Sequence, residues 1–250
     1  EGFEKLKETV AEYTAEHVSE ITAVAVSDLR AAARAYATAE SAAILYTLGI
    51  TQHTTGTDNV LSVANLAMLT GNIGKPSAGV NPLRGQNNVQ GACDMGALPN
   101  VYTAYQKVGE PQIQDKFSKA WGVPLSEKPG LAVTKAINAA HDGKIKGMLV
   151  MGENPILSEA NANHAGKALE KLEFLVVQDI FMTETAAYAD VVLPAASYAE
   201  QLGTYTNTER RVQLSYPAIP PPGAARPDWE ILTDLANRFG LDWSYRGAEE

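Results

Sequence analysis

The spacing of apolar residues along the chain predicts helices and strands in alternation. Apolar residues recur three or four positions apart in the segments expected to be helical, and short continuous apolar runs mark the expected strands. Strands that alternate with helices at this spacing are typical of βαβ units and a mostly parallel sheet. The predicted helices cover residues 3–17, 27–39, 58–70, 101–108, 112–121, 131–141, 158–172 and 229–239, and the predicted strands cover residues 42–46, 148–151, 174–177 and 190–193.

The fold class is therefore expected to be α/β, with mostly parallel sheets flanked by helices. We expect three segments, with a first boundary near residue 86 inside a long polar loop. Four prolines between residues 217 and 222 predict a stiff, extended connector before the last helix. The segments are an α/β segment over residues 1–86, an α/β domain over residues 87–216, and the connector with its helix over residues 217–250.

The loop over residues 79–96 carries the strongest chemical signal in the chain. It reads GVNPLRGQNNVQGACDMG, with four glycines, one arginine and many side-chain amides, and it has no helical or strand period. A folded domain gathers so many hydrogen-bonding groups in one loop mainly where it holds something polar.

Polar loops also follow three of the predicted strands, over residues 48–56, 152–155 and 178–185. Ligands of open α/β sheets bind beyond the carboxyl ends of the strands. In the third loop, Asp179 precedes a threonine-rich turn, and a carboxylate there can accept two N–H donors from a purine edge. None of the three loops matches the dinucleotide fingerprint or the Walker A loop.

The composition narrows the function classes. A formal net charge of -9 argues against a nucleic-acid partner, and no apolar run is long enough to span a bilayer. The single cysteine, Cys93, cannot build a disulfide or an iron–sulfur cluster within the chain, and the four histidines lack ligand-like spacing. No metal-ligating residue is assigned.

Five blocks of this sequence, in this order, resemble the molybdopterin oxidoreductase family and cover essentially the whole chain. The first block resembles in particular the substrate-side loop of molybdenum- or tungsten-dependent formate dehydrogenases, because it contains Arg84. The last two blocks are shared with nitrate reductases and other relatives. The blocks are NPLRGQNN at 81–88, MGENP at 151–155, VQDIFMTETA at 177–186, ADVVLP at 189–194 and GTYTNTERR at 203–211.

The resemblance implies Rossmann-like halves of a catalytic subunit that binds two molybdopterin guanine dinucleotides around one molybdenum or tungsten. It implies that Asp179 binds the guanine base and that Gly49 and Gln52 lie against one cofactor. Asp228 also fits a plain helix N-cap. The residues that the resemblance assigns to the cofactor are Gly49, Gln52, Gln86, Asn154, Gln178, Asp179, Gln201 and Asp228.

Arg84 is the residue that the resemblance assigns to the substrate, formate. A guanidinium is a rigid, permanently charged donor whose two prongs match a planar carboxylate. Arg84 would orient formate toward the metal and stabilise charge during its two-electron oxidation to carbon dioxide.

Two features of the family pattern are missing. The chain lacks the N-terminal cysteine set of an iron–sulfur cluster and the cysteine or selenocysteine, followed by histidine, that ligates the metal. We therefore expect an internal segment of a larger subunit, inactive toward formate as an isolated polypeptide. Its expected partners are formate, the other domains of its own subunit and electron-transfer subunits. No leader is recognisable, so a cytoplasmic location is expected, and a periplasmic one fits if a leader has been removed.

Three other functions fit parts of the same pattern. The first is another enzyme of this family, such as a nitrate reductase, against which Arg84 argues. The second is a cofactor-free scaffold subunit of a respiratory complex, which would not be expected to keep the polar loops at the strand ends. The third is a generic nucleotide-binding α/β module, which is what the residues predict without the resemblance.

Overall fold

The computed structural model describes residues 2–250, and their contacts divide them into two units that meet between Gly85 and Gln86. The break falls inside the polar loop, and residues 217–250 belong to the second unit. Helices and small, mostly parallel sheets make up both units, which confirms the predicted α/β class. Within residues 2–250, no helix is long and apolar enough to cross a membrane.

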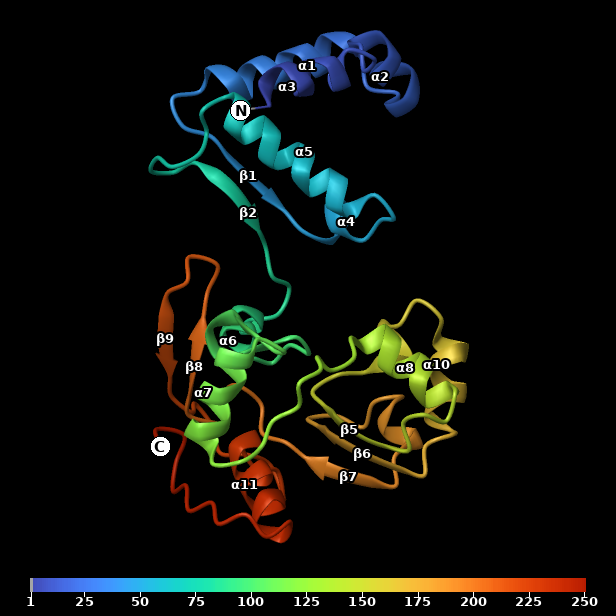
Figure 1. Cartoon of the computed structure of the whole chain (residues 1–250), viewed down its shortest axis with the longest axis vertical. Helices are drawn as coiled ribbons and strands as arrows, with labels where there is room; N and C mark the ends of the chain where they lie inside the picture. The colour runs from blue at the N-terminus through green and yellow to red at the C-terminus, as the bar shows by residue number, and fades with distance from the viewer. Residues whose placement is uncertain (1) are drawn as a thin grey trace. The chain divides into compact units, whose positions relative to one another are not determined.

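The first unit contains a two-stranded parallel sheet and five helices (Figure 1). Its strands pair in register from Ala43 opposite Gly79 to Tyr46 opposite Pro82, so their carboxyl ends lie at the same edge. The elements of this unit are α1 (Phe3–Val10), α2 (Ala15–Thr22), α3 (Val26–Thr38), β1 (Ala43–Tyr46), α4 (Leu48–Thr51), α5 (Gly56–Leu69) and β2 (Gly79–Pro82).

The second unit is built on a three-stranded parallel sheet with the order β5-β6-β7 (Figure 1). Val150, Val177 and Val192 are neighbours across its three strands. The central elements are α8 (Val133–His141), β5 (Gly147–Met151), α9 (Pro155–Ser158), α10 (Ala162–Leu169), β6 (Phe174–Asp179), the 3₁₀ turn η2 (Ala186–Tyr188) and β7 (Val191–Pro194).

Two antiparallel hairpins and three further helices complete the second unit. These elements are α6 (Val89–Asp94), β3 (Val101–Tyr102), the 3₁₀ turn η1 (Thr103–Tyr105), β4 (Gln106–Lys107), α7 (Pro111–Trp121), β8 (Gly203–Thr206), β9 (Val212–Ser215) and α11 (Asp228–Arg238).

The hydrophobic core of the second unit lies between the sheet and its helices. Val150, Leu175 and Val177 alternate with residues of the opposite face and pack against Leu169 of α10. A neighbouring cluster joins α8 to α10 through Ile137, Ala140, Ala165 and Ala168. These two helices cover one face of the sheet, and α10 forms the crossover between β5 and β6 that allows the two strands to run parallel.

Capping residues change the bounds of two predicted helices. The helix predicted over residues 3–17 is wrong, because Thr14 accepts a hydrogen bond from the backbone N–H of His17 and starts α2. The helix predicted over residues 158–172 is shorter in the structure: α9 ends at Ser158, and α10 begins only at Ala162, where Asn161 accepts a hydrogen bond from the N–H of His164. Such side-chain caps compete with continuous helix.

The helix predicted over residues 101–108 is also wrong. These residues form the hairpin β3–β4, in which Ala104 and Tyr105 have positive φ angles. The ring of Tyr102 stacks on Phe117 of α7 at a centroid distance of 4.6 Å, so packing against a later helix holds the segment extended. In the first unit, residues 48–51 form the short helix α4 inside the polar loop that was predicted over residues 48–56.

We predict that Leu175→Ala lowers the free energy of unfolding of the second unit by about 2–5 kcal/mol, because a 1% exposed side chain leaves a cavity. Phe174→Ala is the matched control on the same strand, since Phe174 is 51% exposed, and its cost should be below about 1 kcal/mol. Urea unfolding followed by tryptophan fluorescence measures both, because all three tryptophans lie after residue 86. Equal losses for the two variants would contradict the assigned core.

Candidate functional site

The carboxyl ends of β5, β6 and β7 open into a cavity of about 580 Å³ within the second unit. Its other walls come from β8, from the first turn of α11 and from two residues just after the unit boundary, Asn87 and Asn88. Four of the residues predicted to bind a cofactor line this cavity, namely Gln178, Asp179, Gln201 and Asp228.

Gln178 is the most deeply buried polar residue of the cavity. It is 1% exposed, and its Nε2 donates a 2.6 Å hydrogen bond to Oδ1 of Asp228. Its Oε1 is also buried and has no hydrogen-bond partner among the described residues. A buried acceptor without a donor costs free energy, so this oxygen is ready to accept a hydrogen bond from a ligand.

Asp228 reaches Gln178 because the segment before α11 continues the edge of the sheet. The backbone N–H of Arg226 donates to the carbonyl of Pro194, and its own carbonyl accepts from Ala196. This bridge places Pro227 as the N-cap and Asp228 as the first helical residue. The interpretation of Asp228 as a plain N-cap is therefore wrong, because its carboxylate is used by Gln178.

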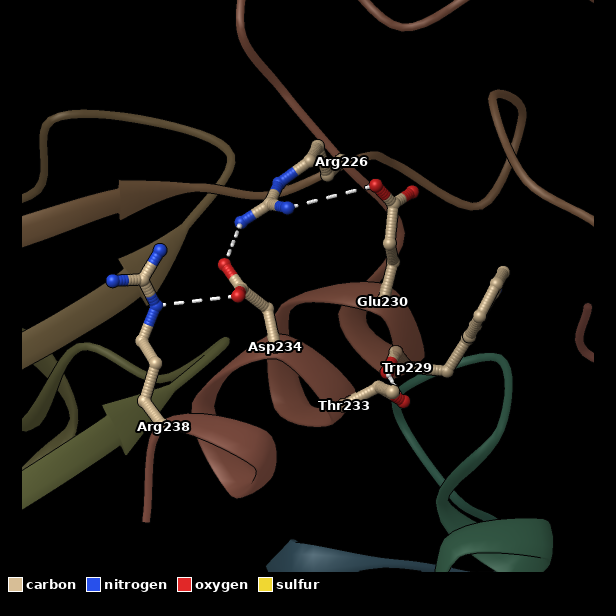
Figure 2. A network of polar contacts seen from close by, with 6 residues as sticks. All are labelled: Arg226, Trp229, Glu230, Thr233, Asp234 and Arg238. Atoms are coloured by element: carbon tan, nitrogen blue, oxygen red, sulfur yellow. Dashed lines mark hydrogen bonds and ion pairs between the residues drawn. The ribbon is translucent and has the colours of Figure 1, made fainter. Parts of the chain in front are cut away.

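The side chain of Arg226 holds the same helix from outside (Figure 2). Its guanidinium lies 3.6 Å from Oε1 of Glu230 and 3.3 Å from Oδ2 of Asp234. Arg238 and then Arg226 donate to Asp234 and hold the pKa of that carboxyl below its usual range. These contacts tie the first two turns of α11 to Arg226, whose backbone is bonded to the end of β7.

Asp179 lies at the last position of β6. Its carbonyl accepts from the N–H of Ala195, and its Oδ1 accepts from the N–H of Ile180 at 2.7 Å. Two carboxylates, those of Asp179 and Asp228, thus line the cavity, and no lysine or arginine occurs among the described residues that line it. The cavity therefore favours a ligand group that donates N–H bonds over a phosphate.

Three aromatic side chains also line the cavity: Tyr198, Tyr205 and Trp229. Burial raises the pKa of the Tyr205 phenol, and the negative charge of Asp228 and the neighbouring Tyr198 raise it further. Apolar rings beside hydrogen-bond acceptors suit a flat, polar heterocycle, which can stack on the rings and donate at its edge.

The sequence prediction missed the role of Asn88. Its Oδ1 accepts a 3.0 Å hydrogen bond from the backbone N–H of Thr206 on β8, which holds the polar loop against the cavity wall. A Cβ at Gly91 would collide with that same oxygen, so the bond requires glycine there. The polar run over residues 79–96 was the available signal, but nothing in it points to Thr206.

Asn154 does not line the cavity. Its Oδ1 accepts from the N–H and the Oγ1 of Thr185, and its Nδ2 donates to Glu184 at 2.7 Å. The bond from Asn154 lowers the pKa of the Glu184 carboxyl. Asn154 therefore joins the loop after β5 to the loop after β6, and Gln86 likewise lies outside the cavity lining.

The other three predicted site residues belong to the first unit. Gly49 lies in α4 and Gln52 caps its end, directly after β1, and Arg84 follows β2. Since β1 and β2 are parallel and in register, all three lie beyond the same edge of that sheet. Arg84 is exposed, and a Cβ at Gly49 would meet open space, so no described neighbour requires glycine there.

Comparison with known proteins gives the family. The model of the molybdopterin oxidoreductase family matches residues 7–238. The chain belongs to the molybdopterin oxidoreductase family. This result confirms the family resemblance that the five sequence blocks indicated.

Its curated relatives include formate dehydrogenases. The chain is 54% identical over 241 residues to the F420-dependent formate dehydrogenase subunit alpha of Methanocaldococcus jannaschii, covering 96% of this chain and 35% of that protein. It is 47% identical over 251 residues to formate dehydrogenase H of Escherichia coli, covering 100% of this chain and 35% of that protein. The chain thus spans about a third of the length of these relatives.

A solved structure of the same fold is the acetylene hydratase of Pelobacter acetylenicus. It matches with a TM-score of 0.71 at 23% identity, over 96% of this chain and 36% of that chain. Membership of this family implies a molybdopterin cofactor. Among residues 2–250, no group of three or more His, Cys, Asp or Glu could hold a metal ion.

We predict that Asp228→Asn lowers the pKa of Tyr205, because it removes a negative charge that disfavours the phenolate while keeping an acceptor for Gln178. Carbon NMR of ring-labelled tyrosine measures this pKa, with Tyr205→Phe to assign the signal. Asp234→Asn is the control on the same helix and should leave the Tyr205 pKa where it is. A Tyr205 pKa that responds equally to both changes, or to neither, would refute the assigned contact.

Proposed function

We propose that this chain is part of the catalytic subunit of a formate dehydrogenase, which oxidises formate to carbon dioxide. The observation that carries the proposal is identity near 50%, over 96–100% of the chain, to proteins named as formate dehydrogenases. The reaction would take place at a molybdenum or tungsten centre held by two molybdopterin guanine dinucleotides. When bound, the metal supplies the acceptor for the two electrons that leave formate.

The residues that line the cavity of the second unit favour this cavity as the binding site of the guanine end of the cofactor. Guanine presents adjacent N–H donors along one edge, and the cavity offers the unpartnered Oε1 of Gln178 and the carboxylates of Asp179 and Asp228. The aromatic rings supply stacking surfaces for the flat base. Gln201 lines the same cavity, and we assign it to the dinucleotide.

Asn154 and Gln86 do not line the cavity, and the proposal gives them other roles. Asn154 would act by holding the loops after β5 and β6 at the distance the base requires, as its bonds to Thr185 and Glu184 indicate. We assign Gln86, two residues after Arg84 in the sequence, to the cofactor. In the first unit, Gly49 and Gln52 would approach one cofactor closely, which gives a reason for the glycine that no described neighbour supplies.

Arg84 is the proposed substrate residue. Its guanidinium would hold the formate carboxylate by two parallel N–H···O bonds and keep its charge throughout the reaction. Its position just beyond β2, at the edge of the sheet where Gly49 and Gln52 also lie, is consistent with this role.

The rest of the proposed subunit would supply the metal ligand and an iron–sulfur cluster, and electron-transfer subunits would remove the electrons. We propose a cytoplasmic location for it, with a periplasmic location as the alternative if a leader is removed. The isolated 250-residue chain is expected not to oxidise formate. Intact mass and elemental analysis of the native gene product test the proposal: a much longer subunit with molybdenum or tungsten supports it, and a metal-free product of about this length refutes it.

We predict that Arg84→Lys in the full-length native subunit lowers kcat/KM for formate roughly tenfold to a hundredfold, because an ammonium cannot make the paired, planar contact. Steady-state kinetics with formate and an artificial electron acceptor measure this. Arg238→Lys is the control, since Arg238 forms an exposed ion pair with Asp234 on the same helix. Unchanged kinetics in Arg84→Lys would contradict its role in holding the substrate.

We predict that Gln178→Met in the full-length subunit reduces the amount of cofactor retained, because the near-isosteric side chain offers neither the donor nor the strong acceptor of the amide. The readouts are guanine nucleotide released by acid and molybdenum or tungsten per subunit, independent of turnover. Gln213→Met is the control, because Gln213 is an exposed residue of β9. Equal cofactor content in the two variants would argue against a base-binding cavity.

A further inference from the structure

Thr185 is a buried threonine at the end of the loop after β6, and its exposed fraction is 0%. Its Oγ1 donates a 2.7 Å hydrogen bond to Oδ1 of Asn154 and accepts a 3.2 Å hydrogen bond from the backbone N–H of Ile156. Its own backbone N–H donates to the same Oδ1 of Asn154 at 3.2 Å. These three bonds form a clamp between segments that lie 29 to 31 positions apart in the chain.

The clamp exchanges the usual capping partners of the two segments. Asn154 is the N-cap residue of α9, but its side chain makes no capping bond to that helix. Pro155 has no N–H, so the first backbone N–H of α9 is that of Ile156, and Thr185 satisfies it from the other loop. Asn and Thr side chains usually bond to backbone groups near them in the sequence. Because each side chain here serves the other loop, the geometry of each loop depends on the other.

Both loops start at residues that line the cavity. Gly152 follows β5, and Asp179 and Ile180 lie at the end of β6. The backbone N–H of Gly152 donates to the carbonyl of Gln178 at 2.9 Å, which fixes the two loops at their start. The clamp joins the same two loops farther along the chain. The segments between these two sets of bonds form part of the rim of the cavity, so the clamp sets their separation.

Thr185 is itself anchored in the hydrophobic core. The next residue, Ala186, is 2% exposed and belongs to the core cluster of Val150 and Leu175. The carbonyl of Thr185 accepts a hydrogen bond from the N–H of Tyr188 at 3.1 Å, which closes the turn η2. The clamp therefore connects the packed core to the loops at the cavity.

We propose that Thr185 is a positioning residue for this cavity: its hydroxyl holds the loops after β5 and β6 so that Gln178 and Asp179 can receive the base of the cofactor. This inference rests on the proposed function, in which the cavity holds guanine. Thr185 acts through Asn154 and Ile156 and does not line the cavity. A buried hydroxyl costs free energy unless it is hydrogen-bonded, and burial alone would be served as well by valine.

Two pairs of side chains that differ in the hydroxyl test this role in the full-length native subunit. Threonine and Thr185→Val have the same shape, and Thr185→Ser and Thr185→Ala form the smaller pair. We expect guanine nucleotide released by acid, per subunit, to fall roughly threefold to tenfold in the valine and alanine variants and to stay near the unsubstituted level in the serine variant. The melting temperature of each variant is measured on the same samples.

The matched control is Thr38→Val, because Thr38 is an exposed residue of α3 whose hydroxyl donates to Arg34 in its own helix. It should leave the guanine content unchanged. If the serine variant loses as much guanine as the alanine variant, Thr185 acts only through packing and the proposal is overturned. The serine and alanine pair decides the matter even where the valine variant does not fold.

The pKa of Glu184 separates the clamp from the proposed function. Nδ2 of Asn154 donates to Glu184, and this bond lowers the pKa of the Glu184 carboxyl. If Thr185 holds Asn154 in place, Thr185→Val raises this pKa toward its usual value and Thr185→Ser does not. Carbon NMR of labelled glutamate measures it, with Glu184→Gln to assign the signal.

An unchanged Glu184 pKa in Thr185→Val would overturn the clamp itself. A native subunit without guanine nucleotide would refute the proposed function, and with it the role of Thr185 toward a base, even where the Glu184 pKa responds as expected. The two failures are therefore distinguishable, and neither readout uses formate.

Discussion

The buried amide of Gln178 is the constraint on which the arrangement of the cavity depends. A polar side chain that is 1% exposed must be hydrogen-bonded to be tolerated, and its donor reaches a residue fifty positions later in the chain, Asp228. This bond requires the first turn of α11 to lie against the end of β6. The same bond uses the Nε2 of the amide and leaves its Oε1 as a buried acceptor. A ligand in the cavity can donate a hydrogen bond to this oxygen.

The elements around that bond hold different walls of the cavity in place. The backbone bridge of Arg226 to the end of β7 sets where α11 begins, and the guanidinium of Arg226 binds the following turns (Figure 2). Asn88 holds the polar loop on β8 at the opposite wall. The result is a cavity with acceptors and aromatic rings but without cationic side chains among its described lining residues, which suits the base of a nucleotide better than its phosphates.

Both units are built on parallel sheets of very few strands. A parallel sheet needs cover on its faces because its strands are apolar on both sides. In the second unit, α8 and α10 cover one face through the clusters around Leu169 and Ala168. The carboxyl ends of the same strands remain open to the cavity, so the packing that stabilises the sheet also sets where its polar residues lie.

The sequence by itself determined the α/β class, the parallel strands β1, β5, β6 and β7 and the polar residues that follow them, because apolar runs and the polar residues after them are local patterns. It missed the parallel strand β2, which lies inside the polar loop. It also identified the family, since motifs keep their order along the chain. Only the tertiary structure decided which polar residues meet. The side chain of Asn88 accepts a hydrogen bond from Thr206, 118 positions later in the chain. The carboxylate of Asp228 accepts a hydrogen bond from Gln178 and does not cap its own helix. Tyr102 lies in a hairpin and stacks on Phe117, where the spacing of apolar residues predicted a helix. The physical reason is that burial satisfies each polar group with whatever partner the packed chain brings near, and local spacing carries no information about that partner.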